Sequence, residues 1–283
     1  MRRLTIRLCG LLPALSLALF AWLHQTVPSY DLIESSVDRN ALAANRTAPA
    51  HDAPSRTSAA TPAVRPGGYA PRYPRYVTAN GLAAWSEYRE RGARSCIRAF
   101  LYREGHTLDL GTLGGRSCVV TGLNAAGHVI GWSHTPEGEQ HAFLWRDGQR
   151  LDLGTLPGGR VSYAYALNDR DEVVGQADTE TEEIHAFLWR EGQMRDLGLL
   201  PRGRESSACA LNSQGQVVGR VITESGAYHA VVWNEGQIAD LNYLVPFQKG
   251  LTLEQALSID EQGRIRVKGT RQRQERMFLL SPR

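Results

Sequence analysis

The chain has 283 residues, 42% of them hydrophobic and 22% charged, a composition typical of a soluble globular protein with one large all-β domain or two smaller domains. Its formal net charge of +3 is unevenly distributed, because residues 1–75 hold nine arginines and four acidic residues. Residues 76–283 therefore carry a net charge of −2, which excludes the strongly basic surface expected of a nucleic-acid-binding domain.

The first 29 residues have the pattern of a targeting segment. Three arginines precede an uncharged apolar run of 16 residues, from Leu8 to Leu23. A membrane-spanning helix needs roughly 20 residues, and the string VPS that ends at Ser29 suits a signal peptidase. We predict a cleaved signal peptide over residues 1–29, with an uncleaved signal anchor at Leu8–Leu23 as the alternative. Both predict export to the periplasm or the extracellular space, and the second adds attachment to the inner membrane.

Residues 30–71 are predicted to form a disordered linker. Most of this stretch, such as NRTAPAHDAPSRTSAATPAVRPGGYAP, is rich in Ala, Pro, Ser and Thr and nearly free of large apolar side chains. Such a segment cannot bury enough surface to offset the entropy lost on ordering.

Residues 72–283 are built from a repeated phrase. The string HAFLW opens at His141 and His185, HAVVW opens at His229, and weaker copies open at Arg98 and Arg276. These positions are 43, 44, 44 and 47 residues apart. A phrase that returns at a fixed interval indicates a structural repeat rather than a single catalytic motif.

Each repeat predicts four short strands. The first ends at a Leu-Asn pair and leads through an Asn-x-x-Gly turn into a strand such as HVIGW or EVVGQ. A variable polar loop follows, then the HAFLW strand, a tight Asp-Gly or Glu-Gly turn, and a strand such as RLDL. Two hairpins make an antiparallel four-stranded sheet. The apolar run AFLW lacks alternation, which predicts that both faces of the sheet are covered.

Sheets of this size that cover one another form a β-propeller. We predict an all-β fold of five blades over residues 72–283. The fifth repeat lacks a fourth strand after MFLLS, and we expect residues Gly68–Arg75 to supply it and close the ring.

The phrases HAFLW, DLGTLGG, ALN and VVG resemble the HAF family of probable extracellular repeat proteins. The resemblance covers residues 76–280 and is strongest in the second to fourth repeats. It implies export and a repetitive β fold, and it implies no known reaction or ligand.

The recurring polar residues have both structural and ligand-binding interpretations. A metal site is conceivable for the repeated histidines, but the repeat holds them far apart, so we interpret them as hydrogen-bonding a neighbouring blade or loop. Each repeated aspartate is expected to accept backbone N–H groups of the glycine turn that follows it, rather than to bind calcium. The repeated aromatic residues are expected in the core. These sets are His141, His185 and His229; Asp109, Asp152, Asp196 and Asp240; and Tyr102, Trp145, Trp189 and Trp233.

Three arginines are candidate ligand-binding residues. Arg116, Arg160 and Arg204 each lie eight residues before the asparagine of a turn and follow a glycine-rich loop. In one register they would ring a channel mouth and clamp a carboxylate or phosphate, although solvated arginines beside glycines are the simpler interpretation. The variable loops of the same face are acidic and suit either a soluble rim or a binding surface.

Cysteine spacing predicts one disulfide. Cys96 is expected just before a third strand, and Cys118 is expected one loop after the following fourth strand, so an oxidising compartment would favour a Cys96–Cys118 bridge. Cys209 is expected to be a buried free thiol.

The function expected from these patterns is an exported, non-catalytic propeller that binds a protein, a glycan or a small anion. We expect no cofactor, no metal and no nucleic acid, since no catalytic or phosphate-binding motif occurs. A polysaccharide-active hydrolase or lyase that uses loop carboxylates is one alternative. A structural protein anchored in the membrane through Leu8–Leu23 is the other.

Overall fold

The computed structural model describes residues 28–34, 76–91 and 94–283. These residues form five four-stranded antiparallel sheets and one short helix, α3 (Leu241–Leu244). No helix in the described ranges is long and apolar enough to cross a membrane. The five four-stranded sheets confirm the sequence-based prediction of an all-β repeat fold with four strands in each unit.

The five sheets follow the order of the repeats. Sheet 1 consists of β2 (Tyr76–Val77), β3 (Ala83–Arg91), β4 (Arg94–Arg103) and β5 (His106–Asp109). Sheet 2 consists of β6 (Cys118–Leu123), β7 (Val129–His134), β8 (Gln140–Arg146) and β9 (Gln149–Asp152). Sheet 3 consists of β10 (Ser162–Leu167), β11 (Val173–Asp178), β12 (Ile184–Arg190) and β13 (Gln193–Asp196). Sheet 4 consists of β14 (Gly203–Leu211), β15 (Val217–Thr223), β16 (Tyr228–Asn234) and β17 (Gln237–Asp240). Sheet 5 has the order β1 (Tyr30–Glu34), β20 (Gln274–Pro282), β19 (Ile265–Arg271) and β18 (Leu251–Ile259).

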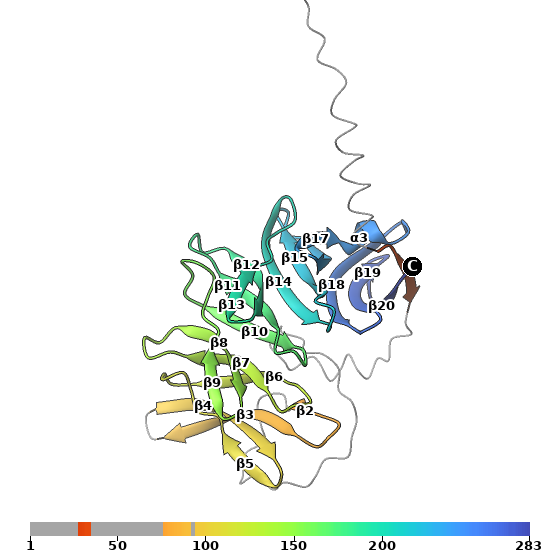
Figure 1. The fold of residues 1–283 in the computed structure, drawn as a ribbon. Coiled ribbons are helices and arrows are strands. Elements are labelled where there is room, and N and C mark those ends of the chain that lie inside the picture. The colour runs from red at the N-terminus through yellow and green to blue at the C-terminus, as the bar shows by residue number, and fades with distance from the viewer. Residues whose placement is uncertain (1–27, 35–75, 92–93) are drawn as a thin grey trace, which may run out of the picture.

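The sheets are stacked face to face in a propeller-like fan. The first strand of each sheet packs against the first three strands of the sheet before it, whereas the fourth strand packs chiefly on the third strand of its own sheet. The sheets therefore converge at their first strands and spread toward their fourth strands. Figure 1 shows them in an arc that begins with sheet 1 at the bottom and ends with sheet 5 at the upper right.

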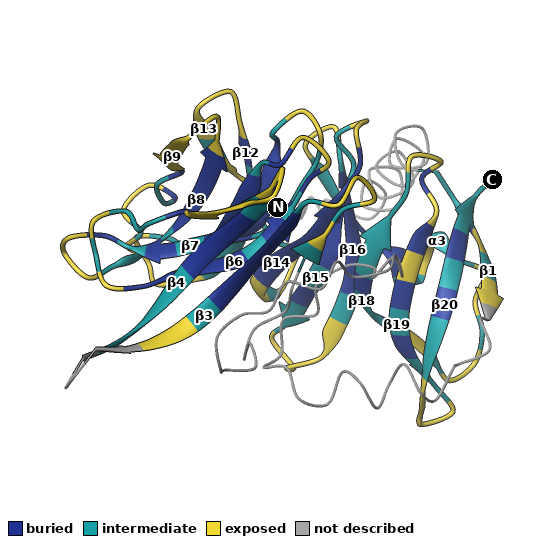
Figure 2. Ribbon diagram, turned by 90° about the horizontal axis from the view of Figure 1, so that it is seen from below, coloured by how far each residue is buried: buried dark blue, intermediate teal, exposed yellow. Residues whose placement is uncertain are grey.

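Apolar layers fill the spaces between consecutive sheets. Figure 2 shows the buried residues concentrated along the strands. Phe143 and Trp145 lie in the layer between sheets 1 and 2, and Trp189 lies in the layer between sheets 2 and 3. Sheet 1 also carries a small buried cluster around Trp85 and Phe100 on the face turned away from sheet 2. The expectation that the repeated tryptophans are core residues is confirmed, because the repeat places each of them in such a layer.

The turns within each sheet have the expected chemistry. In the turn after β6, the side-chain Oδ1 of Asn124 accepts the backbone N–H of His128 at 2.9 Å, and Gly127 has a φ of +88°. In sheet 3 the glycine position is held by Asp171 at a φ of +59°. Short polar residues tolerate this left-handed conformation better than others, so the substitution preserves the turn.

The repeated glycine of the second strand is explained by a bulge in the first strand. The pairing of β10 with β11 shifts between Ala164 and Ala166, and a Cβ added to Gly175 would lie 1.9 Å from the carbonyl oxygen of Tyr163. The equivalent contact at Gly219 is 2.0 Å from the carbonyl oxygen of Ser207. Any side chain there would collide with the backbone of the first strand. The glycine of the V-V-G phrase is therefore required by the bulge.

Two sets of polar side chains tie consecutive sheets together. At one end of the sheets, the Nδ2 of Asn168 donates to the carbonyl oxygen of Asn212 at 3.2 Å, and Asn212 donates to that of Asp260 at 3.1 Å. At the opposite end of the first strand, the Oγ of Ser162 accepts the backbone N–H of Ala142 at 2.8 Å. Both bonds repeat from sheet to sheet, so they fix the position of each sheet on the one before it.

The fourth strand of sheet 5 is β1, and the predicted source of this strand is wrong. Residues Gly68–Arg75 lie outside the described residues, and Tyr30–Glu34 pair with β20 instead. The backbone N–H of Arg283 also bonds the carbonyl oxygen of Ser29 at 3.0 Å. Tyr30 is fully buried in the layer between sheets 4 and 5, which supplies the energy for this pairing.

The predicted domain boundaries change accordingly. Residues 30–34 belong to the folded part and not to a linker, because Tyr30 and Leu32 pack on the apolar layer of sheet 5. The other predicted linker residues, 35–71, and the targeting segment up to residue 27 lie outside the described residues.

We expect β1 to depend on the ring of Tyr30 and not on its hydroxyl. The hydroxyl is buried without a hydrogen-bond partner, and burial raises the pKa of Tyr30 to about 12. Tyr30→Ala should therefore lower the free energy of unfolding by about 3 kcal/mol or more, whereas Tyr30→Phe should be neutral or stabilising. Urea denaturation followed by circular dichroism measures both.

Ile33→Ala on the same strand is the matched control, because Ile33 is 54% exposed and its loss should change stability by less than about 0.5 kcal/mol. Equal stability of Tyr30→Ala and the unmodified protein would show that β1 does not hold sheet 5 together.

Candidate functional site

The repeated histidines are held by aspartates of their own sheets. His141 Nδ1 lies 2.9 Å from Asp152 Oδ2, and His229 Nδ1 lies 2.6 Å from Asp240 Oδ2. His185 makes the same contact with Asp196 in sheet 3. Each pair joins the third strand to the fourth strand of one sheet, so the expectation of a bond to a neighbouring blade or loop is corrected.

The other carboxylate oxygen of each repeated aspartate accepts a backbone N–H from the following turn. The Oδ1 of Asp152 accepts from Gly154 at 2.8 Å, and the Oδ1 of Asp109 accepts from Gly111 at the same distance. This part of the prediction is confirmed. In sheet 1, Arg98 replaces the histidine and donates to Asp109 Oδ2 at 2.7 Å, so a cation or imidazole on the third strand fulfils one structural role.

The histidines lie in separate sheets, one pair to each sheet. Within the described ranges, no group of three or more His, Cys, Asp or Glu side chains is close enough to hold a metal ion. Both carboxylate oxygens of each aspartate are engaged in the strand and turn contacts. Each His–Asp pair therefore has a structural role, since it holds the third strand, the fourth strand and the following turn together.

His229→Ala should destabilise the protein through Asp240, whose side chain is only 4% exposed. Removal of the imidazole leaves a buried carboxylate oxygen without its partner, which costs about 1–3 kcal/mol. Thermal denaturation with and without EDTA measures the change and tests for a metal at the same time.

His106→Ala is the control, because His106 is exposed at the start of β5 and its loss should change stability by less than about 0.5 kcal/mol. A melting temperature of the unmodified protein that falls in EDTA, with no such fall in His229→Ala, would show that His229 is a metal ligand.

The loop end, defined as the end of the sheets that carries the connections 135–139, 179–183 and 223–227, holds the three predicted arginines. All three are exposed. The Nε of Arg116 donates to the carbonyl oxygen of Ser95 at 2.5 Å, and the Nε of Arg160 donates to Glu139 Oε1 at 2.9 Å. Arg116 and Arg160 thus each contact the preceding sheet, and their role as an anion clamp stays a prediction.

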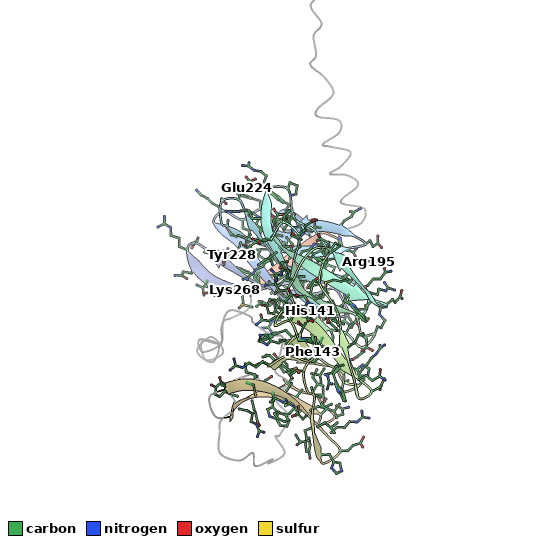
Figure 3. The ribbon with its side chains drawn as sticks, turned by 90° about the vertical axis from the view of Figure 1, so that its left-hand side faces the viewer. His141, Phe143, Arg195, Glu224, Tyr228 and Lys268 are labelled. Atoms are coloured by element: carbon green, nitrogen blue, oxygen red, sulfur yellow. The ribbon has the colours of Figure 1, made fainter. Side chains whose placement is uncertain are left out.

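Acidic residues of the loop end are also engaged. The Oε1 of Glu139 bonds Arg160, and its Oε2 lies 3.8 Å from His141 Nε2. The Oδ1 of Asp178 accepts the backbone N–H groups of Arg160 at 2.8 Å and Val161 at 2.7 Å. Glu224, at the outer tip of its loop in Figure 3, pairs with Arg202 at 3.1 Å.

The glycine pairs before the first strands are required by these loops. A Cβ on Gly115 would lie 2.2 Å from the carbonyl oxygen of Thr135, and a Cβ on Gly159 would lie 2.1 Å from that of Asp178. The glycines let the chain approach the loop backbone of its own sheet. The phrase GGR therefore places Arg116 and Arg160 at the loop end for a structural reason, and Arg204 follows a single glycine, Gly203.

Unrepeated aromatic and polar side chains gather where sheet 3 meets sheet 2. We call the four residues Trp132, His134, Gln140 and Tyr163 the rim cluster. The ring centroids of Trp132 and His134 are 5.6 Å apart, and those of Trp132 and Tyr163 are 6.1 Å apart, both edge to face. The hydroxyl of Tyr163 donates to Gln140 Oε1, and Gln140 Nε2 lies 3.4 Å from His134 Nε2.

Two polar atoms at the rim cluster have no hydrogen-bond partner. They are the Nδ1 of His134 and the Oγ1 of the adjacent Thr135, and both are buried. An amide nitrogen can only donate, so Gln140 donates to Nε2 of a neutral His134, which places the imidazole proton on the unpaired Nδ1. Burial also raises the pKa of Tyr163, with a smaller contribution from the charge of Asp178.

Sequence reasoning missed the rim cluster because it followed residues that repeat. The signal was present as a break in the pattern. The position of Trp132 in the second strand is occupied by Gln176 in sheet 3 and Arg220 in sheet 4, and the position of Tyr163 is occupied by Ser207 in sheet 4. A register-by-register search for unrepeated aromatic residues finds both.

The predicted Cys96–Cys118 disulfide is absent, because both cysteines are free thiols. Cys118 lies in the apolar layer between sheets 1 and 2, which also contains Ala99 and Leu101 of β4. Side chains alternate along a strand, so Cys96 shares the opposite face of β4 with Phe100. The two cysteines were expected at neighbouring ends of an antiparallel pair, but they lie in different sheets, and only the Cys118 thiol points into the layer between these sheets. Cys209 is a buried thiol, as predicted, and its sulfur accepts a hydrogen bond from Gln255 Nε2 at 3.5 Å.

The thiols should differ in reactivity. Burial raises the pKa of Cys118 to about 12, so its reactive thiolate is scarce at neutral pH and alkylation accelerates only as the pH approaches that value. Cys96 is half-buried and should react first with iodoacetamide at pH 8. Peptide mapping without reductant measures the order, and recovery of a disulfide-linked Cys96–Cys118 peptide would contradict the structure.

No protein-family model and no curated protein matches the chain. Similar solved structures include TolB from Acinetobacter baumannii, at 14% identity and a TM-score of 0.41, covering 74% of this chain and 55% of TolB. A gluconolactonase from Xanthomonas campestris matches at 16% identity and a TM-score of 0.38, covering 74% of this chain and 71% of the enzyme. The acylaminoacyl peptidase of Pyrococcus horikoshii matches at 14% identity and 0.44, covering 69% of this chain and 35% of the peptidase. These similarities concern the arrangement of β-sheets and do not extend to function.

Proposed function

We propose that the protein is an exported, non-catalytic scaffold of HAF-type repeats that binds a ligand at the loop end of a five-bladed propeller. The proposal includes closure of the ring, in which sheet 5 would meet sheet 1. The cluster around Trp85 and Phe100 supports it, because that buried apolar face of sheet 1 corresponds to the faces that meet a preceding sheet elsewhere in the fan.

One observation carries the proposal. The repeated polar side chains are used by the fold itself, as the His229–Asp240 pair and the Asn168 and Ser162 bonds illustrate. Four unrepeated polar and aromatic side chains, those of the rim cluster, gather instead at the loop end. Residues that a repeat does not require for packing are free to serve recognition, and loops on a rigid frame are where binding residues concentrate.

The engaged carboxylates of the loop end support binding over hydrolysis. A glycosidase needs one carboxyl group as acid and a second one free as base or nucleophile. Here Glu139 bonds Arg160, and Asp178 accepts two backbone N–H groups. The polysaccharide-active alternative would have to break these contacts or use exposed carboxylates of the same loops, such as Glu137 and Glu180.

Export and anchoring are part of the same proposal. Because β1 begins at Tyr30, only six residues separate Leu23 from the folded part. At about 3.5 Å for each extended residue, an uncleaved anchor would hold sheet 5 within about 20 Å of the bilayer. The predicted linker of residues 30–71 does not separate Leu23 from sheet 5, because the chain enters that sheet at Tyr30.

The test is a thermal-shift and calorimetric screen of the full-length chain with neutral oligosaccharides, uronate oligosaccharides and inorganic phosphate, with mass spectrometry of the carbohydrate afterwards. We expect one class to raise the melting temperature in proportion to its occupancy and to be recovered intact. Cleavage of an oligosaccharide that is lost in Glu139→Gln would show that the protein is an enzyme.

The variant R116A/R160A/R204A tests the anion clamp in the same screen. Its melting temperature should stay close to that of the unmodified protein, because all three side chains are exposed. If phosphate or uronate is the class that protects the unmodified protein, it should protect the variant less. Equal protection of the variant and the unmodified protein would rule out a role for the arginines.

A further inference from the structure

We infer that the rim cluster is a subsite for one pyranose ring of a neutral glycan. The inference rests on the proposed function and narrows it to one ligand class and one pair of sheets. It follows from three features of the cluster: the aromatic rings, the hydrogen-bonding groups between them and the charge around them.

The aromatic rings provide an apolar surface of the right kind. Trp132 and Tyr163 are half-buried, so part of each ring stays accessible. Their centroids are 6.1 Å apart with an angle of 79° between the planes, which places two apolar surfaces at a right angle. The C–H face of a pyranose ring packs on such surfaces, while its hydroxyl groups lie at the edge.

The polar groups beside the rings match those hydroxyl groups. Gln140 bridges Tyr163 and His134, and this chain fixes the orientation of all three side chains. His134 Nδ1 and Thr135 Oγ1 still lack partners. Both atoms are closed off from solvent, so a sugar hydroxyl group reaches them only when the side chains shift, whereas Gln140 and Tyr163 are half-buried and lie closer to the surface. Sugar hydroxyl groups both donate and accept, as this mixed set requires.

The charge around the cluster favours a neutral sugar over an acidic one. Glu139 and Arg160 neutralise each other at 2.9 Å, and the guanidinium of Arg160 has its pKa raised chiefly by the hydrogen bond to Glu139. The carboxylate of Asp178 remains close by and is held by two backbone N–H groups. A uronate would therefore meet one negative charge, on Asp178, that no ion pair neutralises, and no unpaired positive charge from these residues.

The experiment is isothermal titration of the full-length chain with cellohexaose, maltohexaose and chitohexaose, and with hexagalacturonate as the acidic counterpart. We expect one neutral hexasaccharide to bind and hexagalacturonate to bind at least tenfold more weakly. Trp132→Gln installs the residue that sheet 3 carries at the same register, so the strand tolerates it. That variant should bind the neutral glycan at least tenfold more weakly.

A second variant and a control complete the test. Tyr163→Phe keeps the ring and removes the bond to Gln140, and it should weaken binding by about three- to tenfold, with an unchanged melting temperature reporting on folding. Arg220→Ala, at the register of Trp132 in sheet 4, lies outside the rim cluster and should leave affinity unchanged.

The outcomes separate this inference from the proposed function. Neutral binding that Trp132→Gln leaves intact, or preferential binding of hexagalacturonate, would overturn the rim subsite and leave the scaffold proposal standing. Absence of binding to all four oligosaccharides would overturn the subsite, and the wider ligand screen then decides on the scaffold.

Discussion

The fold depends on how the first strand of each sheet is accommodated by the sheet before it. This strand lies where the sheets converge, so its polar groups lie among apolar layers with little access to water. Side-chain bonds such as Asn212 to the carbonyl of Asp260, at 3.1 Å, and Ser206 to the N–H of Ala186, at 2.8 Å, satisfy groups that would otherwise be buried and unpaired. Apolar layers alone would let one sheet slide along the next, whereas these hydrogen bonds form in one register only. Each buried polar group that loses its partner lowers the free energy of unfolding by about 1–3 kcal/mol.

That requirement explains which residues repeat. The glycine of the second strand, such as Gly219, lets the bulged first strand approach. The His229–Asp240 pair fixes the outer hairpin, and the carboxylate also holds the N–H of Asn242 at the start of α3. These residues repeat because each sheet must pack on the sheet before it through the same contacts. Repetition is consequently a poor guide to recognition, which needs residues that differ from sheet to sheet.

The two ends of the fan are where the repeat fails to supply a partner. Sheet 5 lacks a fourth strand of its own and takes β1 from the other end of the sequence, held by the buried ring of Tyr30 and an ion pair of 2.7 Å between Arg283 and Asp31. This arrangement spares sheet 5 an exposed edge at β20, which lowers the risk of association through unpaired strands. It also couples the residues next to the predicted targeting segment to the stability of the last sheet.

The sequence by itself determined the repeat, the four strands of each unit, the turn chemistry at Asn124 and Gly127, the buried tryptophans and the contact of each repeated aspartate with the following turn. These features are local, or arise from a short period, so composition and spacing reveal them. The tertiary structure decided the rest: that Tyr30–Glu34 complete sheet 5, that Cys96 and Cys118 point to opposite faces, and that Trp132 and Tyr163 meet across two sheets. Each of these depends on which way a side chain points once two distant segments pack together, and a linear pattern carries no information about that direction.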